Sequence, residues 1–307
     1  MSRISYKPEG CCAEGTGDCY YTEAALEKAM AKGQILEARA SVCDENMSLS
    51  VDLGAMRGII KKEDVAFTAS GLPVKDIAAI TRVGKSVCFT VTDITEIHGE
   101  RVAVLSRRAA QEKCLYNFLF QARPGDVIPA RVTHLEPFGA FVDIGCGVVS
   151  LLSIDCISVS RISHPRDRLY PGMFIKTVVK SIDKENFRIS VSHRELLGTW
   201  EENAAMFKVG QTVSGTVRSI EDYGIFIELS PNLAGLAEYS DGISVGQSAT
   251  VYIKNIIPEK MKVKLAVVDV FPAQKAVPSH EYFFSGDHLD YWRYSPAECT
   301  KVIETFF

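Results

Sequence analysis

The stretch PFGAFVDIG, residues 137–145, predicts a β-strand with one buried face. Alternation of apolar residues with other residues is typical of such a strand. It places Ala140, Val142 and Ile144 on the buried face and Phe141 and Asp143 on the other. An aromatic side chain is therefore expected on the polar face of the strand, beside a carboxylate.

A second stretch of the same design is YGIFIEL, residues 223–229. Its residues Ile225, Ile227 and Leu229 are expected to face inward, while Phe226 shares the outer face with Glu228. Two outward aromatic residues in equivalent positions indicate a repeated unit. Glycine-led strand starts recur in the same way, and three units of one plan emerge. These glycines are Gly33, Gly84, Gly125, Gly172, Gly210 and Gly246.

Each unit is predicted to consist of short strands without a helix long enough for a βαβ crossover. In the middle unit the expected strands are residues 127–135, 140–144, 148–154, 174–182 and 188–191. Five strands in about 70 residues favour a closed barrel, because a small open sheet leaves two unprotected edges. The predicted fold class is all-β, with three tandem five-stranded OB-fold barrels joined by short helices.

The predicted organisation has seven parts. They are an N-terminal arm with a short helix capped by Thr22 and ended by Gly33 (residues 1–32), a divergent barrel (33–108), a linker helix (109–123), the best-preserved barrel (124–194), a second linker helix (195–208), a third barrel (209–271) and an aromatic-rich tail (272–307). The linker helices are expected to dock on neighbouring barrels, which makes the spacing semi-rigid. The tail contains too many aromatic residues for a disordered segment, so it is expected to pack on a barrel, with a partner protein as the alternative.

Composition excludes several classes of protein. The 307 residues are 47% hydrophobic and 23% charged, as in ordinary globular proteins. Nine cysteines without even, tight spacing favour a reducing cytoplasm over a disulfide framework. No signal peptide and no apolar run of about 18 residues is found, so a membrane is not an expected partner. A formal charge of −4 means that nucleic acid must bind through a local patch.

Aromatic residues on a barrel face suggest a binding chemistry. Small barrels of the oligonucleotide-binding kind offer one strand face to single strands, and each base stacked on an aromatic ring contributes about 1–3 kcal/mol. Phe138 and Phe141 suit that role, and the recurrence at Tyr223 and Phe226 favours it. The alternative is that Phe141 only covers the barrel exterior or meets a linker helix.

A basic surface is also expected on the middle unit. Residues 161–188 contain seven basic residues and only three acidic ones, Asp167, Asp183 and Glu185. The basic residues are Arg161, Arg166, Arg168, Lys176, Lys180, Lys184 and Arg188. The alternative is an ordinary solvated face, since charged residues crowd the surface of any small domain.

The middle unit closely resembles the S1 RNA-binding domain, the repeat of a bacterial small-subunit ribosomal protein that also occurs in RNA-decay enzymes and translation factors. The similarity runs from Gly125 through residues 138–145 to the stretch IDKENFRIS, residues 182–190. It implies that RNA lies on two aromatic residues, a histidine, an aspartate and an arginine. The corresponding residues are Phe138, Phe141, Ser153 in place of the histidine, Asp183 and Arg188, with Lys180 as a nearby phosphate contact.

The third unit resembles the same domain less faithfully. Tyr223 and Phe226 keep the aromatic pair, Lys262 replaces the arginine, and Lys254 is a further candidate for phosphate binding. Glu238 takes the histidine position, where a carboxylate would repel phosphate, and Ile257 takes the aspartate position. In the first unit Met47 and Ser50 replace the aromatic pair, so a docking role is expected there. The three-unit layout resembles short members of the family from Gram-positive anaerobes.

The sequence thus predicts binding of single-stranded RNA or mRNA, mainly through the middle barrel, in support of translation or RNA metabolism. The resemblance makes the small ribosomal subunit a further expected partner. The alternative is a protein-interaction scaffold that docks a ribosomal or RNA-decay partner. The oligomeric state is not predicted.

Enzymatic activity, a cofactor and a metal are not expected. The sequence has no Walker-type loop and no His-Glu-x-x-His motif, and its six histidines are dispersed. Cys11, Cys12 and Cys19 could bind zinc but have no evident fourth ligand. Because Gly10, Gly15 and Gly17 follow no strand, the N-terminal stretch is interpreted as a flexible arm rather than a phosphate cradle.

Overall fold

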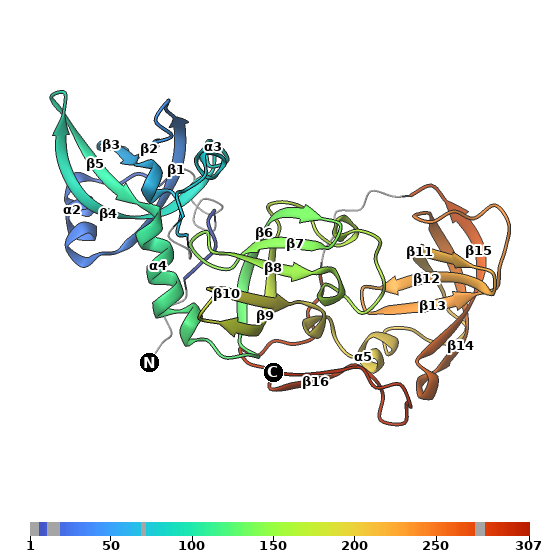
Figure 1. Cartoon of the computed structure of the whole chain (residues 1–307). Coiled ribbons are helices and arrows are strands. Elements are labelled where there is room, and N and C mark those ends of the chain that lie inside the picture. The colour runs from blue at the N-terminus through green and yellow to red at the C-terminus, as the bar shows by residue number, and fades with distance from the viewer. Residues whose placement is uncertain (1–5, 11–18, 69–71, 274–279) are drawn as a thin grey trace.

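The computed structural model describes residues 6–10, 19–68, 72–273 and 280–307, which form three closed five-stranded barrels arranged in a row (Figure 1). Barrel 1 comprises β1 (Ile35–Cys43), β2 (Leu49–Asp52), β3 (Arg57–Ile60), β4 (Ser86–Ile97) and β5 (Glu100–Ser106). Barrel 2 comprises β6 (Val127–Glu136), β7 (Gly139–Asp143), β8 (Val149–Ser153), β9 (Phe174–Asp183) and β10 (Arg188–Ser192). Barrel 3 comprises β11 (Thr212–Glu221), β12 (Gly224–Ser230), β13 (Leu233–Ala237), β14 (Ser248–Ile257) and β15 (Lys262–Phe271).

All three barrels share one strand order. Each runs first, second, third, fifth and fourth strand, and the first and fourth strands close the circle. The third and fifth strands are the parallel pair in each barrel, and the other pairs are antiparallel. The predicted fold class of tandem OB-type barrels is therefore confirmed, and the five strands of barrel 2 lie where the sequence predicted them.

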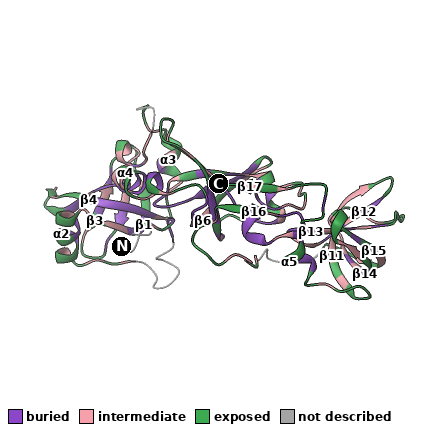
Figure 2. Cartoon of the chain, turned by 90° about the horizontal axis from the view of Figure 1, so that it is seen from below, coloured by how far each residue is buried: buried purple, intermediate pink, exposed green. Residues whose placement is uncertain are grey.

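The core follows the alternation of the strands. Ala140, Val142 and Ile144 are fully buried, as are Ile225 and Ile227 at the equivalent positions of barrel 3. Purple stretches along the strands of each barrel in Figure 2 show the same inward faces.

A glycine begins the second strand of barrels 2 and 3 for a steric reason. A Cβ atom on Gly139 would lie 2.5 Å from the carbonyl oxygen of Leu152, and one on Gly224 would lie 2.4 Å from that of Ala237. Only glycine lets the strands approach so closely at the start of the aromatic stretch.

Short helices surround the barrels. They are α2 (Glu23–Lys32), η1 (Lys62–Asp64), α3 (Asp76–Ile80), α4 (Arg107–Asn117), η2 (Leu119–Gln121), η3 (Ile154–Cys156), η4 (Pro165–Asp167), η5 (Arg194–Leu197), α5 (Trp200–Ala204) and η6 (Pro258–Lys260). Thr22 caps α2 by accepting a hydrogen bond from the backbone N–H of Ala25, and Gly33 ends the helix in the left-handed conformation, as predicted. In the part of the chain that the structure describes, none of these helices has the length and apolar character needed to cross a membrane.

Helix α4 joins barrels 1 and 2. It begins two residues earlier than expected because the Ser106 hydroxyl accepts the N–H of Ala109 and thereby caps it. The side chain of Gln111 accepts the N–H of Phe67 from barrel 1 and donates to the carbonyl of Gly147 in barrel 2. The linker is therefore packed against both barrels.

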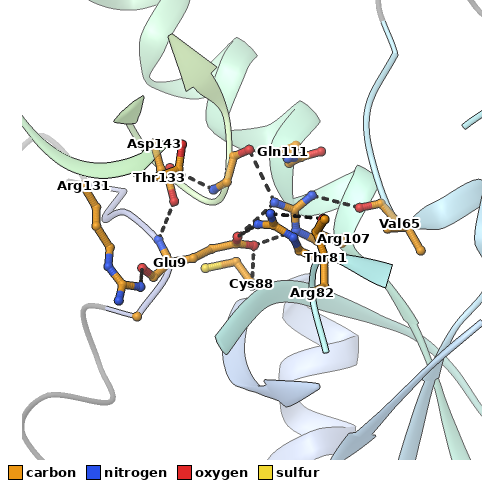
Figure 3. Close-up of polar contacts among 12 residues, drawn as sticks. Glu9, Val65, Thr81, Arg82, Cys88, Arg107, Gln111, Arg131, Thr133 and Asp143 are labelled. Atoms are coloured by element: carbon orange, nitrogen blue, oxygen red, sulfur yellow. Dashed lines mark hydrogen bonds and ion pairs between the residues drawn. The ribbon is translucent and has the colours of Figure 1, made fainter. Parts of the chain in front are cut away.

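The described N-terminal segment, Tyr6–Gly10, is packed rather than flexible, which corrects the expectation of a flexible arm for these residues, whereas Gly15 and Gly17 lie outside the described residues. Glu9 is 4% exposed, and its carboxylate lies 2.6 and 2.9 Å from the guanidinium nitrogens of Arg107 (Figure 3). The N–H of Cys146 donates to the carbonyl of Lys7. This segment is wedged between barrels 1 and 2, where the buried carboxylate and guanidinium compensate each other.

The second linker is broken rather than continuous. Gly198 separates η5 from α5 with a φ of 84°, and a Cβ atom there would lie 2.7 Å from the Phe283 ring. Asn232 of barrel 3 accepts the N–H of Val159 and donates to the carbonyls of Arg194 and Gly198. Three hydrogen bonds of one fully buried side chain thus join barrel 3 to barrel 2 and to the second linker.

The described part of the tail, residues 280–307, packs within the chain as predicted. Trp292 and Tyr294 belong to the core of barrel 3, and the Tyr282 hydroxyl accepts the N–H of Lys176 in barrel 2. Strands β16 (Tyr291–Arg293) and β17 (Glu304–Phe306) pair with each other, and the C-terminus lies beside barrel 2 (Figure 1). The tail therefore holds barrels 2 and 3 together.

Candidate nucleic-acid interface

The two aromatic residues of barrel 2 form a defined pair on its outer surface. Phe138 lies in the turn before β7 and is 55% exposed, whereas Phe141 lies on β7 and is half-buried. Their ring centroids are 6.1 Å apart and the rings are perpendicular. This edge-to-face arrangement leaves the face of Phe138 available to a stacked base. No aromatic contact joins Phe141 to a linker helix within the described residues.

Barrel 3 repeats this geometry. Tyr223 is 68% exposed, and its ring lies 6.1 Å from that of Phe226 at an angle of 89°. The equivalence follows from the backbone, since the turn and the strand that carry the pair are the same in both barrels. The two pairs therefore have the same geometry.

His134 was not predicted as part of the surface. It lies on β6 directly opposite Phe141, and the two rings are stacked with centroids 6.4 Å apart. The His134 Nε2 atom lies 2.7 Å from the carboxylate of Glu136. Pairing the predicted first and second strands would have revealed it, because directly opposite side chains share a face. The equivalent residue opposite Phe226 is Ser219.

The rest of the outer face carries one exposed leucine and two serines. Leu151 lies opposite Phe141, and Ser190 follows in the parallel pair with β8. The hydroxyls of Ser190 and Ser181 are 2.5 Å apart. The outer face beside the aromatic pair therefore combines one apolar side chain with two hydroxyls.

Ser153 stands opposite Gly139, at the edge of the aromatic pair. Its hydroxyl donates to the carboxylate of Asp155, and this hydrogen bond together with the nearby Lys180 lowers the pKa of Asp155. The position where the resemblance implied a histidine thus carries a hydroxyl that is hydrogen-bonded to a carboxylate. Lys180 is exposed, with its Nζ atom 3.5 Å from the sulfur of Cys156, so a cation lies beside this carboxylate.

Asp183 and Arg188 face each other across the β9–β10 hairpin. The Asp183 carboxylate accepts the side-chain N–H of Asn186 at 2.7 Å and the backbone N–H groups of Glu185 and Asn186. The hydrogen bond from the Asn186 side chain is the main cause that lowers the pKa of Asp183. Asp183 therefore holds the turn, while Arg188 remains exposed.

The expected basic surface is smaller than predicted. Arg168 is 3% exposed and pairs with the Glu228 carboxylate, which also binds the Arg218 guanidinium at 2.9 Å. Lys176 lies over the ring of Tyr282, with its Nζ atom 5.6 Å from the ring centroid. Arg168 thus joins barrels 2 and 3 rather than facing solvent. The exposed basic residues of this set are Arg161, Arg166, Lys176, Lys180, Lys184 and Arg188.

The outer-face carboxylates of β7 and β12 are covered as well. Glu228 is 8% exposed beneath Arg168, and Asp143 is 2% exposed beneath Glu9, whose N–H it accepts at 2.7 Å. Burial and the neighbouring Glu9 carboxylate raise the pKa of Asp143 to about 7. The expectation that these carboxylates lie on an open polar face is therefore wrong, because each is buried by a neighbouring unit.

In barrel 3 a lysine pairs with Glu238, the carboxylate that replaces the family's histidine. Lys254 lies 2.9 Å from the carboxylate of Glu238, and this hydrogen bond lowers the pKa of Glu238. Because Glu238 is 87% exposed, the pair contributes little to stability, yet it reduces the negative charge near the aromatic pair. Lys262 lies opposite Ile257 and is exposed. In barrel 1, Met47 and Ser50 occupy the positions of the pair and offer no ring.

No group of histidine, cysteine, aspartate or glutamate side chains is placed to hold a metal ion within residues 6–10, 19–68, 72–273 and 280–307. Cys11 and Cys12 lie outside these ranges.

A closed barrel with this strand order and an outward aromatic pair defines the class of oligonucleotide-binding barrels. Within that class, residues 121–194 match the S1 RNA binding domain. Barrel 2 is therefore a member of the S1 RNA-binding domain family.

Similarity to named proteins extends beyond barrel 2. The chain is 31% identical over 228 residues to the small ribosomal subunit protein bS1 homolog of Bacillus subtilis, which covers 71% of this chain and 58% of that protein. It is 32% identical over 263 residues to the bS1 homolog of Bacillus cereus, which covers 82% of this chain and 64% of that protein. The chain thus spans less than two thirds of the length of these relatives.

An enzyme is also among the relatives. The 4-hydroxy-3-methylbut-2-enyl diphosphate reductase of Clostridium acetobutylicum is 34% identical over 204 residues, which is 61% of this chain but only 32% of the enzyme. Among solved structures, GSP13 from Bacillus subtilis aligns with 24% of this chain and 57% of its own, at 27% identity and a TM-score of 0.23. The fold assignment therefore depends on the strand order.

Proposed function

We propose that this chain binds single-stranded RNA or mRNA chiefly through the outer face of barrel 2 and thereby supports translation or RNA metabolism. The perpendicular pair of Phe138 and Phe141, extended by His134, carries the proposal because it lies on the surface of the S1-matched residues. The names of the bS1 relatives support a role on the small ribosomal subunit.

The mechanism is stacking combined with phosphate contacts. One base stacks on the exposed face of Phe138 and a second lies against Phe141 and His134, each contributing about 1–3 kcal/mol. Arg188 and Lys180 are exposed and available to backbone phosphates. Because stacking accepts any base, sequence specificity is low.

Barrel 3 adds a second, weaker contact. Tyr223 and Phe226 repeat the pair, and Asn232 and the tail hold their barrel close to barrel 2. A second site at a fixed distance raises avidity through its effective concentration. Lys254 and Lys262 would contact phosphate there.

Barrel 1 favours the alternative of a docking module. Met47 and Ser50 replace the aromatic pair, so this unit has no stacking surface at that position. If the whole chain acted only as a protein-interaction scaffold, replacing Phe138 and Phe141 would leave its binding to the partner protein unchanged. An enzymatic role is not proposed, since the relatives that match most of the chain are named as ribosomal proteins.

Fluorescence anisotropy with a labelled, unstructured RNA of about 20 nucleotides tests the proposal. Replacing both phenylalanines (Phe138→Ala/Phe141→Ala) should weaken binding at least tenfold, because two stacks are lost. The matched control is Tyr291→Ala/Phe306→Ala, a pair of tail aromatics whose rings are 4.7 Å apart. The control should bind within twofold of the original chain. Absence of binding at low salt, or equal losses in both variants, would contradict the proposal.

A further inference from the structure

A cavity of about 590 Å³ opens between barrels 1 and 2 and is called the joint cavity below. Its charged lining consists of Glu9, Arg39, Arg82, Lys85, Arg131 and Asp143. These residues come from the N-terminal segment, β1, the turn between α3 and β4, β6 and β7. Cationic side chains from both barrels therefore line one space, and Figure 3 shows two of them, Arg131 and Arg82, on either side of Glu9.

The two carboxylates of the joint cavity already have partners. Glu9 binds Arg107, accepts the N–H of Cys88 at 3.0 Å and lies 3.6 Å from Arg82. Asp143 accepts the N–H groups of Glu9, Gly145 and Gly147 at 2.7 to 3.0 Å. Their hydrogen-bonding capacity is directed at these groups rather than at the remaining cations.

The remaining cations lack such compensation. Arg131 lies over the ring of Phe174 and donates to the carbonyls of Gly172 and Glu9, which are neutral acceptors. Among the described residues, no carboxylate forms an ion pair with Arg39, Lys85 or Arg131. Burial, followed by repulsion from Arg82 and Arg131, lowers the pKa of Lys85. An anion in the joint cavity would remove this repulsion.

The shape of the cavity leaves room for such an anion. A Cβ atom on Gly84 would meet no atom within 4 Å, so the space beside Lys85 is open. The volume lies within the range of about 300–1,000 Å³ that is usual for small-molecule sites. Arg131 is held by three contacts before any ligand arrives, which lowers the entropic cost of binding.

We propose that the joint cavity is a phosphate-binding site, in which Arg39, Lys85 and Arg131 contact the phosphate oxygens and Arg82 is shared with Glu9. Arginine and lysine are the usual partners of phosphate, and the guanidinium of Arg131 is already oriented by carbonyls. The phosphate belongs either to the backbone of an RNA strand that passes the joint or to a free polyphosphate. The chemistry is the same in both cases.

Calorimetric titration of the full chain with inorganic pyrophosphate at low salt tests the site directly. Exchanging two exposed cations (Arg39→Gln/Lys85→Gln) should weaken pyrophosphate binding at least tenfold. The matched control is Lys28→Gln/Arg57→Gln, which removes one lysine and one arginine from exposed positions of barrel 1 and its helix outside the cavity. The control should bind within twofold of the original chain, and thermal unfolding should show that both variants fold.

Anisotropy with the 20-nucleotide RNA over a salt series separates the two sources. If an RNA phosphate fills the cavity, the Arg39→Gln/Lys85→Gln variant reduces the slope of log affinity against log salt by about 0.7, which is the contribution of one neutralised phosphate on a single strand. If a free polyphosphate fills it, pyrophosphate binding is lost while the RNA slope stays the same. The Phe138→Ala/Phe141→Ala variant should keep its pyrophosphate binding, so failure of the stacking proposal remains distinguishable. Absence of saturable pyrophosphate binding together with an unchanged RNA slope, or an equal loss in the control, would overturn the site.

Discussion

His134 and Ser219 occupy the same position on the first strands of barrels 2 and 3, each opposite the phenylalanine of its aromatic pair. The imidazole ring stacks on Phe141 with an angle of 24° between the planes. The serine offers only a hydroxyl to Phe226. This single difference adds a third ring to the aromatic pair of barrel 2, although both aromatic pairs have the same geometry.

A reciprocal exchange tests this difference at the scale of one residue. His134→Ser should weaken RNA binding about fivefold, because it removes about 1 kcal/mol of stacking from barrel 2. Ser219→His should strengthen binding by a similar factor, because it adds a ring to barrel 3. Both affinities are measured by anisotropy with the same RNA. A loss of affinity in both variants would mean that the position matters for folding rather than for stacking.

The β9–β10 hairpin contributes both to the outer face of barrel 2 and to the contact between barrels 1 and 2. Its strands carry Lys180 and Arg188, while Phe187 at its turn packs against Phe67 of barrel 1 and Phe120 of the linker. Phe187 has a φ of 53°, a left-handed conformation that costs a non-glycine residue about 1 kcal/mol or more. The hairpin is held in this strained conformation by its contacts with barrel 1.

Two truncations of Phe187 separate packing from backbone strain. Phe187→Ala and Phe187→Gly both remove the ring, and both should lower the free energy of unfolding by a few kcal/mol. The glycine variant should nevertheless be about 1 kcal/mol more stable than the alanine variant, because glycine adopts positive φ without a clash. Urea unfolding of the two variants measures the difference. A more stable alanine variant would show that the turn changes conformation once the ring is removed.

The whole molecule is held by joints that contain buried ionisable groups. His193 is fully buried in barrel 2, where its Nδ1 atom lies 2.8 Å from the carbonyl oxygen of Lys176. The tail covers it with His280, whose ring centroid is 4.7 Å away, and with Tyr282. Burial lowers the pKa of His193 to about 4 and that of His280 to about 3.

This junction makes the stability of the molecule depend on pH. The unfolded histidines bind protons below about pH 6.5, and the folded ones do so only near pH 4 and 3. The stability contributed by the neutral histidines is therefore fully present above pH 6.5. It is lost as the pH falls from 6.5 toward 4, and His193 lowers the free energy of unfolding by about 1.4 kcal/mol per pH unit.

Urea unfolding between pH 7 and 4 checks the prediction. His193→Asn keeps a donor for the Lys176 carbonyl and removes one of the two titrating rings, so it should reduce the slope in this range and leave the part that His280 contributes. His98→Asn, at an exposed turn with positive φ, is the control and should leave the profile unchanged. Equal profiles in the original chain and the His193 variant would show that other groups cause the acid sensitivity.

Local patterns in the sequence were sufficient to predict the strands, the three barrels and the aromatic pairs. Alternation, glycine starts and turn residues act over a few neighbours, so Ala140, Val142 and Gly139 can be assigned without knowledge of the rest of the chain. The candidate RNA-binding positions were found in the same way and by resemblance. Their roles in binding stay predictions until the experiments above are done.

Only the tertiary structure decided which polar groups are exposed. Asp143 is buried by Glu9, which is 134 residues away in the sequence, and Glu228 is buried by Arg168, which is 60 residues away. The sequence places these carboxylates on the outer faces correctly, but exposure depends on what else packs there. The joint cavity arises for the same reason, since its cations converge only when barrels 1 and 2 meet across the N-terminal segment.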